Sequence, residues 1–421
     1  MVGRAYFERW THDSSIEEIV HPLIYDWNTV DTAERPHRPV MLDDETLRDG
    51  LQSPSVISPS IDDKIRILHL IDALGIDTAD IGLPGAGPHV VADVERLAQE
   101  IVSARLTVQA NCAARTLLAD IEPIARVSQK VGLPIECCAF IGSSPIRQYA
   151  EDWTLDRLLA LTEEAVGFAV REGLPVMYVT EDTTRADPES LRRLYGAAIR
   201  AGASRVCIAD TVGHATPTGA AAVVRFVQSI VDECGGGVGI DWHGHRDRDL
   251  AVINSLSAWE AGATRLHGAA VGIGERVGNT PMDMLLVNLV LLGQRTDDLS
   301  RLGEYCELVS EVCGVPLPSN YPVLGRDAFR TATGVHAAAV IKALKKQDAA
   351  LVDAVYSGVP ASLVGREQGI EVGPMSGKSN VVYWLERRGL DASEERVDRI
   401  LASAKAASTV LTEIEIRALL K

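Results

Sequence analysis

The feature that most constrains the fold is a series of eight short, apolar, β-rich segments, each followed by a stretch of helical character. The segments lie at residues 39–44, 78–83, 106–112, 135–141, 176–182, 205–211, 239–245 and 265–271. Strands that are apolar along nearly their whole length and alternate with helices are typical of a parallel sheet covered by helices. Eight such units in roughly 240 residues favour a closed (β/α)8 TIM barrel over the alternative, an open doubly wound sheet.

The segment at 60–75 is the clearest of the helices. Its apolar residues repeat at spacings of three and four, at Ile61, Ile65, Leu68 and Ile71, which predicts one buried face. Ser60 precedes Asp63 by three positions, as in a capping box with Asp in the Glu position. Gly75 is a typical helix stop.

Three regions are expected. Residues 1–37 are irregular and form an N-terminal extension, and residues 38–297 form the TIM-barrel catalytic domain. Residues 298–421 form a mostly helical accessory region that acts as a lid or in dimerisation, with helices at 298–315, 326–349 and 391–420.

The composition excludes several classes of function. The formal net charge of −17 makes the chain a poor ligand for nucleic acid or for an anionic membrane. The N-terminus lacks an apolar signal-peptide core, and the chain lacks a run of roughly 18 apolar residues. The seven cysteines form no CxxC pair and several lie in apolar runs. We therefore expect a soluble, cytoplasmic protein with reduced, packed cysteines.

Polar residues gather where the predicted strands end. Glu45, Arg48, Asp49 and Gln52 follow the first strand, and later strands end at Asp80, Asn111, Glu181, Asp182, Asp210, Thr211, His243 and His245. The carboxyl ends of the strands of a TIM barrel carry its active site. These residues are therefore the candidates for catalysis and binding.

His243 and His245 are two apart in a predicted strand, so their side chains point to the same side. Two imidazoles and a carboxylate make a divalent metal site, and Asp49 is the candidate carboxylate. A structural HxH pair is the alternative interpretation. The loop "VGIGERVGN" after the eighth strand offers Glu275, Arg276 and Asn279 for ligand contact, or it is simply a tight turn.

Five ordered motifs together resemble the 2-isopropylmalate synthase and homocitrate synthase family, which is related to 3-hydroxy-3-methylglutaryl-CoA lyase. They are "DDETLRDGLQ", "EDTTRAD", "IADTVGHATP", "HGHRDRDLAVINSLSAWEAGA" and "GIGERVGN". The resemblance extends from about residue 40 to about residue 385.

The resemblance implies a role for each matching residue. Asp49, His243, His245 and Asn279 correspond to metal ligands, for Mn²⁺, Mg²⁺, Zn²⁺ or Co²⁺. The resemblance implies substrate contacts for Arg48 and Thr211. Further candidates for the substrate are Gln52 and Arg147, the latter at a position that departs from the family pattern, and candidates for the acetyl-CoA co-substrate are Gly274, Glu275 and Asn279. Expected catalytic residues are Arg48, Glu181, His336 and Tyr356. The last two are similar to residues that reach a neighbouring subunit's barrel, which implies a homodimer.

The implied reaction is a metal-dependent Claisen condensation of acetyl-CoA with a 2-oxo acid. A lyase or aldolase on the same barrel is the alternative, since "RDGLQ" is the lyase spelling, but the loop at 272–279 lacks that branch's cysteine. A barrel that only binds a partner is the third possibility. Arg147 and Arg246 depart from the synthase pattern. They indicate either an acceptor with an extra anionic group or two surface ion pairs.

Overall fold

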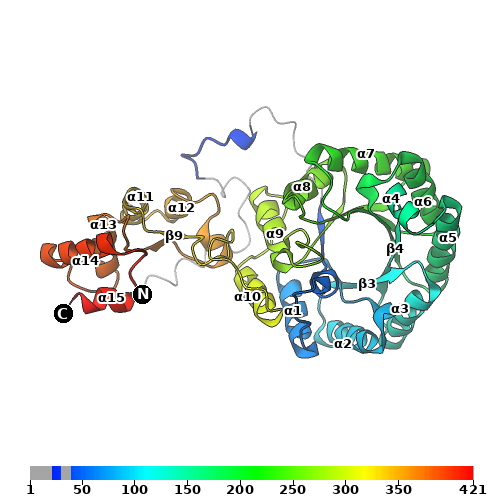
Figure 1. Cartoon of the computed structure of the whole chain (residues 1–421), viewed down its shortest axis with the longest axis horizontal. Helices are drawn as coiled ribbons and strands as arrows, with labels where there is room; N and C mark the ends of the chain where they lie inside the picture. Colours follow the sequence, from blue (N-terminus) through cyan, green and yellow to red (C-terminus); the bar gives the residue numbers. More distant parts are fainter. Residues whose placement is uncertain (1–20, 30–38, 421) are drawn as a thin grey trace. The chain divides into compact units, whose positions relative to one another are not determined.

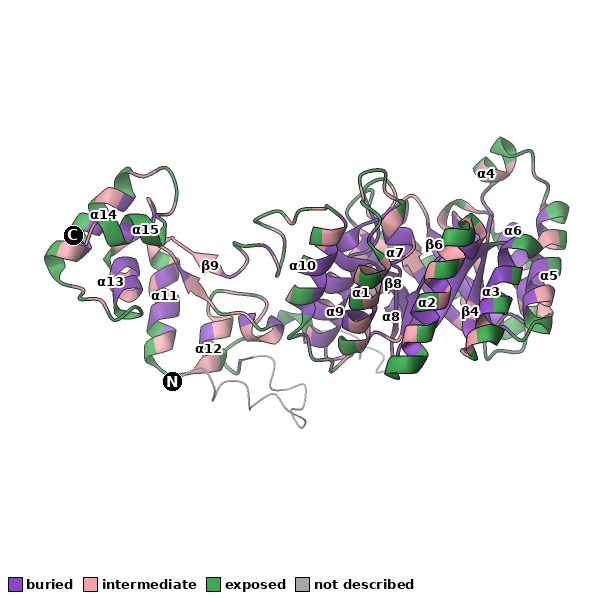
Figure 2. Ribbon diagram, turned by 90° about the horizontal axis from the view of Figure 1, so that it is seen from below, coloured by how far each residue is buried: buried purple, intermediate pink, exposed green. Residues whose placement is uncertain are grey.

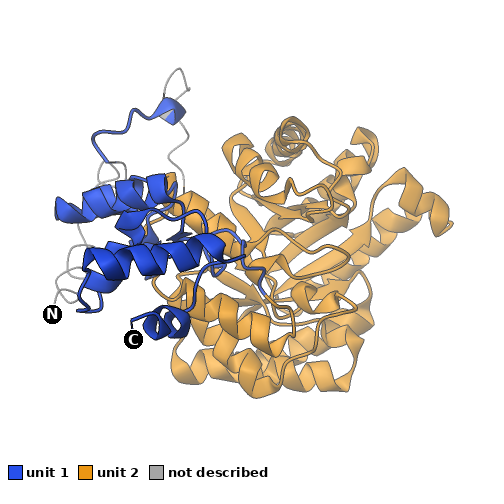
Figure 3. Ribbon diagram, turned by 60° about the vertical axis from the view of Figure 1, so that its left-hand side comes forward, with its two compact units in different colours: residues 1–33, 317–421 blue, residues 34–316 orange. Residues whose placement is uncertain are grey.

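The structure is a computed structural model that describes residues 21–29 and 39–420. The chain divides into two compact units, residues 34–316 and residues 1–33 with 317–421 (Figure 3).

Residues 34–316 contain a closed barrel of eight strands in sequential order, β1 to β8 (Figure 1). The strands are β1 Met41–Asp44, β2 Thr78–Asp80, β3 Gln109–Arg115, β4 Ile135–Gly142, β5 Val176–Glu181, β6 Arg205–Asp210, β7 Gly239–Gly244 and β8 Arg265–Gly268. Every neighbouring pair is parallel, and β8 closes the sheet onto β1. The predicted TIM barrel is confirmed, although β3 begins three residues later than the predicted 106 and continues to Arg115.

Helices surround the barrel (Figure 1). They are α1 Ile61–Ala73, α2 Pro88–Ala104, α3 Leu118–Val131, α4 Pro145–Ala150, α5 Leu155–Arg171, α6 Pro188–Ala201, α7 Pro217–Glu233, α8 Ala251–Ala261, α9 Met282–Leu291 and α10 Leu302–Val312. In α1 the hydroxyl of Ser60 accepts a hydrogen bond from the backbone N–H of Asp63 at 3.2 Å. Gly75 follows the helix with a φ of 71°, so the predicted start and stop are confirmed.

The interior of the barrel is unusually polar. The side chains of Asp43, Asp241, Arg265 and His267 are all buried there. Register places Asp43 beside His267 and Asp241 beside Arg265, so charged side chains lie next to one another on the neighbouring strands β7, β8 and β1. The interior of a TIM barrel is ordinarily filled by branched apolar side chains. Here one side of the interior is a charged network that leads toward the carboxyl ends of the strands.

The barrel unit extends to Pro316, beyond the boundary at 297 that the sequence suggests. The reason is α10, which packs against α1 and buries Tyr305 completely. The hydroxyl of Tyr305 hydrogen-bonds Thr46 at 3.0 Å and also donates to Asp44 at the end of β1. These contacts tie residues 302–312 to the first strand.

The second unit is mostly helical. Its elements are β9 Arg330–Thr331, α11 Gly334–Lys345, α12 Ala349–Ala354, β10 Gly369–Ile370, α13 Lys378–Glu386, α14 Glu394–Ala406 and α15 Glu413–Ala418. The helix expected at 391–420 is two helices, because Thr412 caps a new one by accepting from the N–H of Glu415. The segment 326–349 holds β9 before α11 begins. Residues 21–29 belong to this unit, while the rest of the expected extension at 1–37 lies outside the described residues.

Two further findings concern the whole described chain. Residues 21–29 and 39–420 contain no helix that is both long and apolar enough to cross a membrane. All seven cysteines are free thiols, and only Cys234 is partly exposed.

Candidate active site

Asp49, His243 and His245 meet at the carboxyl ends of β1 and β7. Asp49 begins the short 3-10 helix η4 (Asp49–Gln52) after β1, and His243 and His245 lie at the end of β7. Asp49 Oδ2 is 3.5 Å from His243 Nε2 and 3.9 Å from His245 Nε2. The three side chains are almost completely buried and lie close enough to share one cation. The structure thus brings together the three residues first predicted as a metal site.

The orientation of His243 is set from behind by Glu45. Glu45 Oε2 accepts a hydrogen bond from His243 Nδ1 at 2.7 Å. Burial lowers the pKa of His243, but Glu45 outweighs this and leaves the pKa raised. Nε2, the nitrogen toward Asp49, is therefore the atom that can bind a cation, and Glu45 is an outer partner of a kind common around metal-bound histidines.

His245 is held in its neutral form. Burial, with help from the charge of His243, lowers its pKa to about 4. No described residue hydrogen-bonds to its Nδ1 atom, so nothing comparable to Glu45 fixes its tautomer. A neutral imidazole with a free lone pair is the form that binds a metal ion.

Asn279 completes the group. Its backbone pairs with that of His245 in an isolated bridge, which places the two side by side. The Nδ2 atom of Asn279 donates to the carbonyl of Ile273 at 3.1 Å, which leaves Oδ1 buried and without a partner among the described residues. Gly274 makes this possible, because a Cβ there would lie 2.3 Å from Asn279 Nδ2.

The four side chains fit a divalent cation by their chemistry. A carboxylate, two imidazoles and an amide oxygen are ligands that Zn²⁺, Mn²⁺, Mg²⁺ and Co²⁺ accept in different proportions. The unpartnered Oδ1 of Asn279 is a donor atom that a cation would satisfy. This mixed donor set is compatible with any of these metals.

Arg48 lies between the metal group and β2. Its Nε donates to Asp80 Oδ2 at 2.6 Å, and its Nη1 is 3.5 Å from Asp49 Oδ1. Burial raises the pKa of Asp80 to about 7, although Arg48 opposes this shift. Arg48 is largely buried, and its Nη2 atom also donates to Glu45 Oε1 at 3.3 Å, so its guanidinium lies among three carboxylates at this end of the barrel.

Thr211 and Arg276 lie on the opposite side of the barrel mouth from Arg48. The Thr211 hydroxyl accepts from the N–H of Asp182 at 2.7 Å and can still donate one hydrogen bond. Arg276 donates to the Thr211 carbonyl at 2.6 Å and pairs with Asp247. The loop after β8 is thereby tied to the loops after β6 and β7.

Arg147 and Glu181 face each other above β4 and β5. Arg147 lies in α4, a short helix that projects beyond its neighbours (Figure 2). Its Nη1 is 3.3 Å from Glu151 Oε1, and its Nε is 3.8 Å from Glu181 Oε1. Burial raises the pKa of Glu181, against the opposing effect of Arg147. Arg246 likewise pairs with Asp249 at 3.2 Å.

The remaining sequence candidates are less closely engaged. Gln52 is exposed at the end of η4, and Glu275 is half-buried in the turn that Gly278 closes. His336 and Tyr356 lie in the other unit, where their rings stack with centroids 4.0 Å apart. Tyr356 is half exposed, so the pair presents an aromatic surface.

Two residues that the site depends on have no specific role in the sequence prediction, Glu45 and His267. Glu45 is there a general candidate among the polar residues after the first strand, and His267 is part of an apolar strand. A period-two pattern could have revealed both, since Asp43 and Glu45, Arg265 and His267, and Asp241 and His243 alternate along their strands.

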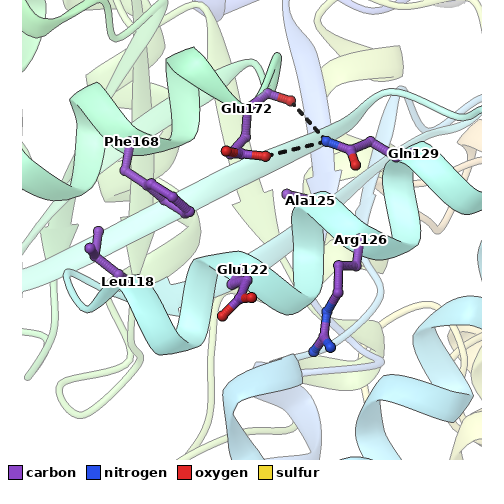
Figure 4. A pocket seen from close by; sticks show the side chains of 7 residues that line it. All are labelled: Leu118, Glu122, Ala125, Arg126, Gln129, Phe168 and Glu172. Carbon is purple, nitrogen blue, oxygen red and sulfur yellow. Dashed lines mark hydrogen bonds between the residues drawn. The ribbon is translucent and has the colours of Figure 1, made fainter.

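A hollow on the outer wall of the barrel lies away from this group (Figure 4). It lies between α3 and α5, has a volume of about 340 Å³ and is lined by residues such as Phe168, Glu122 and Arg126. Gln129 bridges its rim by donating to Glu172. Its lining comes from the outer helices, so we give it no part in catalysis.

Comparisons with known proteins show the family to which the barrel belongs. Residues 40–309 match the HMGL-like family. A probable 2-isopropylmalate synthase from Methanopyrus kandleri is 32% identical over 87% of this chain and 69% of its own length. A homocitrate synthase, AksA, from the same organism is 33% identical over 87% of both chains.

Among solved structures, an HMG-CoA lyase from Brucella melitensis superimposes with a TM-score of 0.55 at 18% identity. It covers 66% of this chain and 99% of its own. At that identity the likeness establishes the shared barrel fold. Fold, site and sequence together define the class: the chain belongs to the HMGL-like family, which is a family of enzymes.

Proposed function

We propose that the protein is a divalent-metal-dependent acyltransferase that condenses acetyl-CoA with a 2-oxo acid. The products are a 2-hydroxy diacid and free CoA. The observation that carries this proposal is the buried group of Asp49, His243, His245 and Asn279 beside Arg48. The names of the relatives at about a third identity, 2-isopropylmalate synthase and homocitrate synthase, support the same reaction.

The proposed roles follow from position and charge. A divalent metal held by Asp49, His243 and His245 would polarise the carbonyl of the 2-oxo acid. Arg48 would bind the acid's carboxylate and stabilise the oxyanion that forms when the new C–C bond is made. The Thr211 hydroxyl would donate its remaining hydrogen bond to a substrate carboxylate.

A base must take one proton from the methyl group of acetyl-CoA before the carbon attacks the 2-oxo carbon. Water then cleaves the thioester and releases the CoA thiol. We propose that His336 takes part in this proton transfer with Tyr356 beside it, and that Glu181 is a second acid–base candidate. We further propose that Gly274, Glu275 and Asn279 form part of the acetyl-CoA site, with Gln52 and Arg147 on the acceptor side.

The resemblance to the synthases also suggests a homodimer in which one protomer supplies His336 and Tyr356 to its partner's barrel. The stacked, half-exposed pair supports this proposal, because an aromatic surface of that kind is suited to contact with a substrate or another chain.

The test is release of free CoA thiol from acetyl-CoA with Mn²⁺ or Mg²⁺, across a panel of acceptors. The panel contains 2-oxoisovalerate, pyruvate, oxaloacetate, 2-oxoglutarate and 3-phosphonopyruvate. We expect thiol release with one acceptor and its loss after chelation of the metal. Addition of metal should restore thiol release in the wild type but give none in Asp49→Asn. The Asp44→Asn variant is the matched control, because Asp44 is equally buried but contacts Tyr305 instead.

A metal-bound protein that releases no thiol with any acceptor would contradict the synthase proposal. The alternative would then be carbon–carbon cleavage in the same barrel, measured as breakdown of a 3-hydroxyacyl-CoA. The sequence feature behind this alternative is Leu51 in "RDGLQ".

A further inference from the structure

Glu45 lies between two imidazoles deep in the barrel. Its Oε2 atom is 2.7 Å from His243 Nδ1, and its Oε1 atom is 3.1 Å from His267 Nδ1. Only 3% of the Glu45 surface is exposed, so water cannot compensate its charge. Each of its two oxygens faces a ring nitrogen, and Oε1 also accepts a hydrogen bond from Nη2 of Arg48 at 3.3 Å.

His267 continues the chain toward the other end of the barrel. Its Nε2 atom is 3.0 Å from Asp241 Oδ2, so both of its nitrogens face carboxylate oxygens. Ionised carboxylates only accept hydrogen bonds, and two such contacts require a hydrogen on each nitrogen. His267 is consequently a cation, buried between two anions.

Two arginines hold Asp241 in its ionised form. Arg265 Nε donates to Asp241 Oδ2 at 2.5 Å, and Arg205 Nε donates to Oδ1 at 2.7 Å. Removal of one charge from a buried network leaves its neighbour uncompensated, which is strongly unfavourable. The charged states of Arg265, Asp241, His267 and Glu45 thus depend on one another.

Glu45, at the end of this series of hydrogen bonds, decides which ring nitrogen of His243 is free to bind a cation. An ionised Glu45 can only accept, so Nδ1 of His243 must carry the hydrogen, and the lone pair lies on Nε2 toward Asp49. A neutral Glu45 could donate to Nδ1 instead, and the hydrogen of His243 would then occupy the metal-facing nitrogen.

We propose that Glu45 and His267 are positioning residues that hold His243 in the tautomer that binds the metal, with His267 acting through Glu45. The inference rests on the proposed metal site and names residues outside it. A second cation site formed by Glu45, His243 and His267, whose ligand atoms also lie close together, is the competing reading. It is disfavoured because a protonated His267 offers no lone pair.

The test measures binding of Mn²⁺ to the full-length protein by isothermal titration calorimetry, independent of catalysis. We expect one ion per chain, and about 10- to 100-fold weaker binding in Glu45→Gln and in His267→Gln. The double variant should bind no more weakly than Glu45→Gln alone, since two residues acting through one path are non-additive. Asp44→Asn, a buried carboxylate change on the same strand, should bind like the wild type.

A second measurement needs no variant. Nitrogen-15 spectra of the imidazoles of the metal-free wild type should show His243 protonated on Nδ1 and His267 protonated on both nitrogens. In folded His267→Gln, the His243 signals should move toward the other tautomer. A neutral His267 in the wild type would overturn the proposal, as would a second bound Mn²⁺ that His267→Gln removes.

Asp49→Asn separates this proposal from the metal site itself. If the wild type and Asp49→Asn bind Mn²⁺ equally, the proposed metal site is wrong and the positioning role falls with it. If Asp49→Asn loses binding while His267→Gln retains full affinity, only the positioning role is overturned.

Discussion

Single hydrogen bonds decide which atoms of this site can bind a cation. Glu45 orients His243, whereas His245 has no such partner and depends on burial for its neutral state. The two histidines lie two residues apart and point to the same side at the end of β7, but their electrostatic surroundings differ. A residue's neighbours in space, and not its motif, therefore set its protonation.

Arg147 and Arg246 illustrate the same point. The sequence left open whether they bind an extra anion of the acceptor or form ion pairs, and the structure pairs both with carboxylates. Partly exposed ion pairs of this kind contribute roughly 0–1 kcal/mol. An acidic substrate could thus replace the weak contact between Arg147 and Glu181 with little loss.

The first prediction concerns Arg147. If the acceptor carries a second anionic group, Arg147→Gln should raise KM for that acceptor on the order of 10-fold, because one charge-assisted hydrogen bond is lost. KM for acetyl-CoA should stay the same. Steady-state kinetics with both substrates varied measures this effect. Arg192→Gln, which removes an exposed ion pair between α6 and α7, is the matched control. An unchanged KM for the acceptor would assign Arg147 to the surface ion pair alone.

At the scale of elements, the loop after β8 positions Asn279 by backbone geometry. Gly274 adopts a φ of 145°, a conformation that L side chains rarely adopt, and it approaches Asn279 too closely for any side chain. The loop is also anchored by Arg276 and by the bridge to His245. Its shape therefore depends on glycine at one position.

The second prediction tests this loop. Gly274→Ala should displace Asn279 and weaken Mn²⁺ binding about 10-fold or more. Gly236→Ala is the matched control, since Gly236 also has a positive φ, 76°, but has open space around it. That control should cost about 1 kcal/mol of stability without changing the affinity for Mn²⁺. Calorimetric titration of both variants distinguishes strain in general from strain at the site.

The third prediction concerns the attachment of α10 to β1. Burial raises the pKa of Asp44 to about 7, while in the unfolded chain it is about 3.9. A raised carboxyl pKa contributes stability that is complete below the unfolded value and is lost as pH rises through the folded value. Asn at this position can accept from Thr46 and donate to Tyr305, so it resembles the protonated form.

The free energy of unfolding of Asp44→Asn, compared with that of the wild type, should therefore increase by about 2–3 kcal/mol as the pH rises from 5 to 8. Denaturant midpoints across this range measure the difference. Asp187→Asn is the control, because the pKa of this helix-capping carboxyl is lowered, and its contribution is already complete above pH 5. A constant difference between Asp44→Asn and the wild type would contradict a raised pKa for Asp44.

At the scale of the whole molecule, the proposed catalytic groups are divided between two compact units. Asp49 and Arg48 belong to the barrel unit, while His336 and Tyr356 belong to the other. A shared site between protomers is one way to bring them together, and it can be tested with inactive variants.

The fourth prediction is complementation between variants. An equal mixture of Asp49→Asn and His336→Ala, after exchange of protomers, should recover about a quarter of wild-type thiol release. Half of the dimers are then heterodimers, and each of these has one complete site of two. A mixture of Asp49→Asn and Arg48→Ala should recover none, since every barrel in it carries one of the two defects. Recovery in neither mixture, with dimers present, would place His336 and Asp49 in the same protomer's site, whereas an active His336→Ala variant on its own would exclude His336 from catalysis.

From the sequence alone came the barrel, the positions of its strands and the group of Asp49, His243 and His245. These follow from local pattern: apolar runs of strand length, helical periodicity and the two-residue repeat of a strand place side chains without knowledge of their neighbours. The attachment of α10 to the barrel unit does not follow from local pattern, because it depends on a contact between Tyr305 and Asp44, far apart in the chain.

Only the tertiary structure decided how those residues are charged and oriented. Glu45 follows β1, while Asp241 and His267 lie on β7 and β8 about two hundred residues later, and closure of the barrel makes the three neighbours in a buried interior. Protonation and tautomer depend on such through-space contacts in a medium of low dielectric constant, and no sequence spacing encodes them.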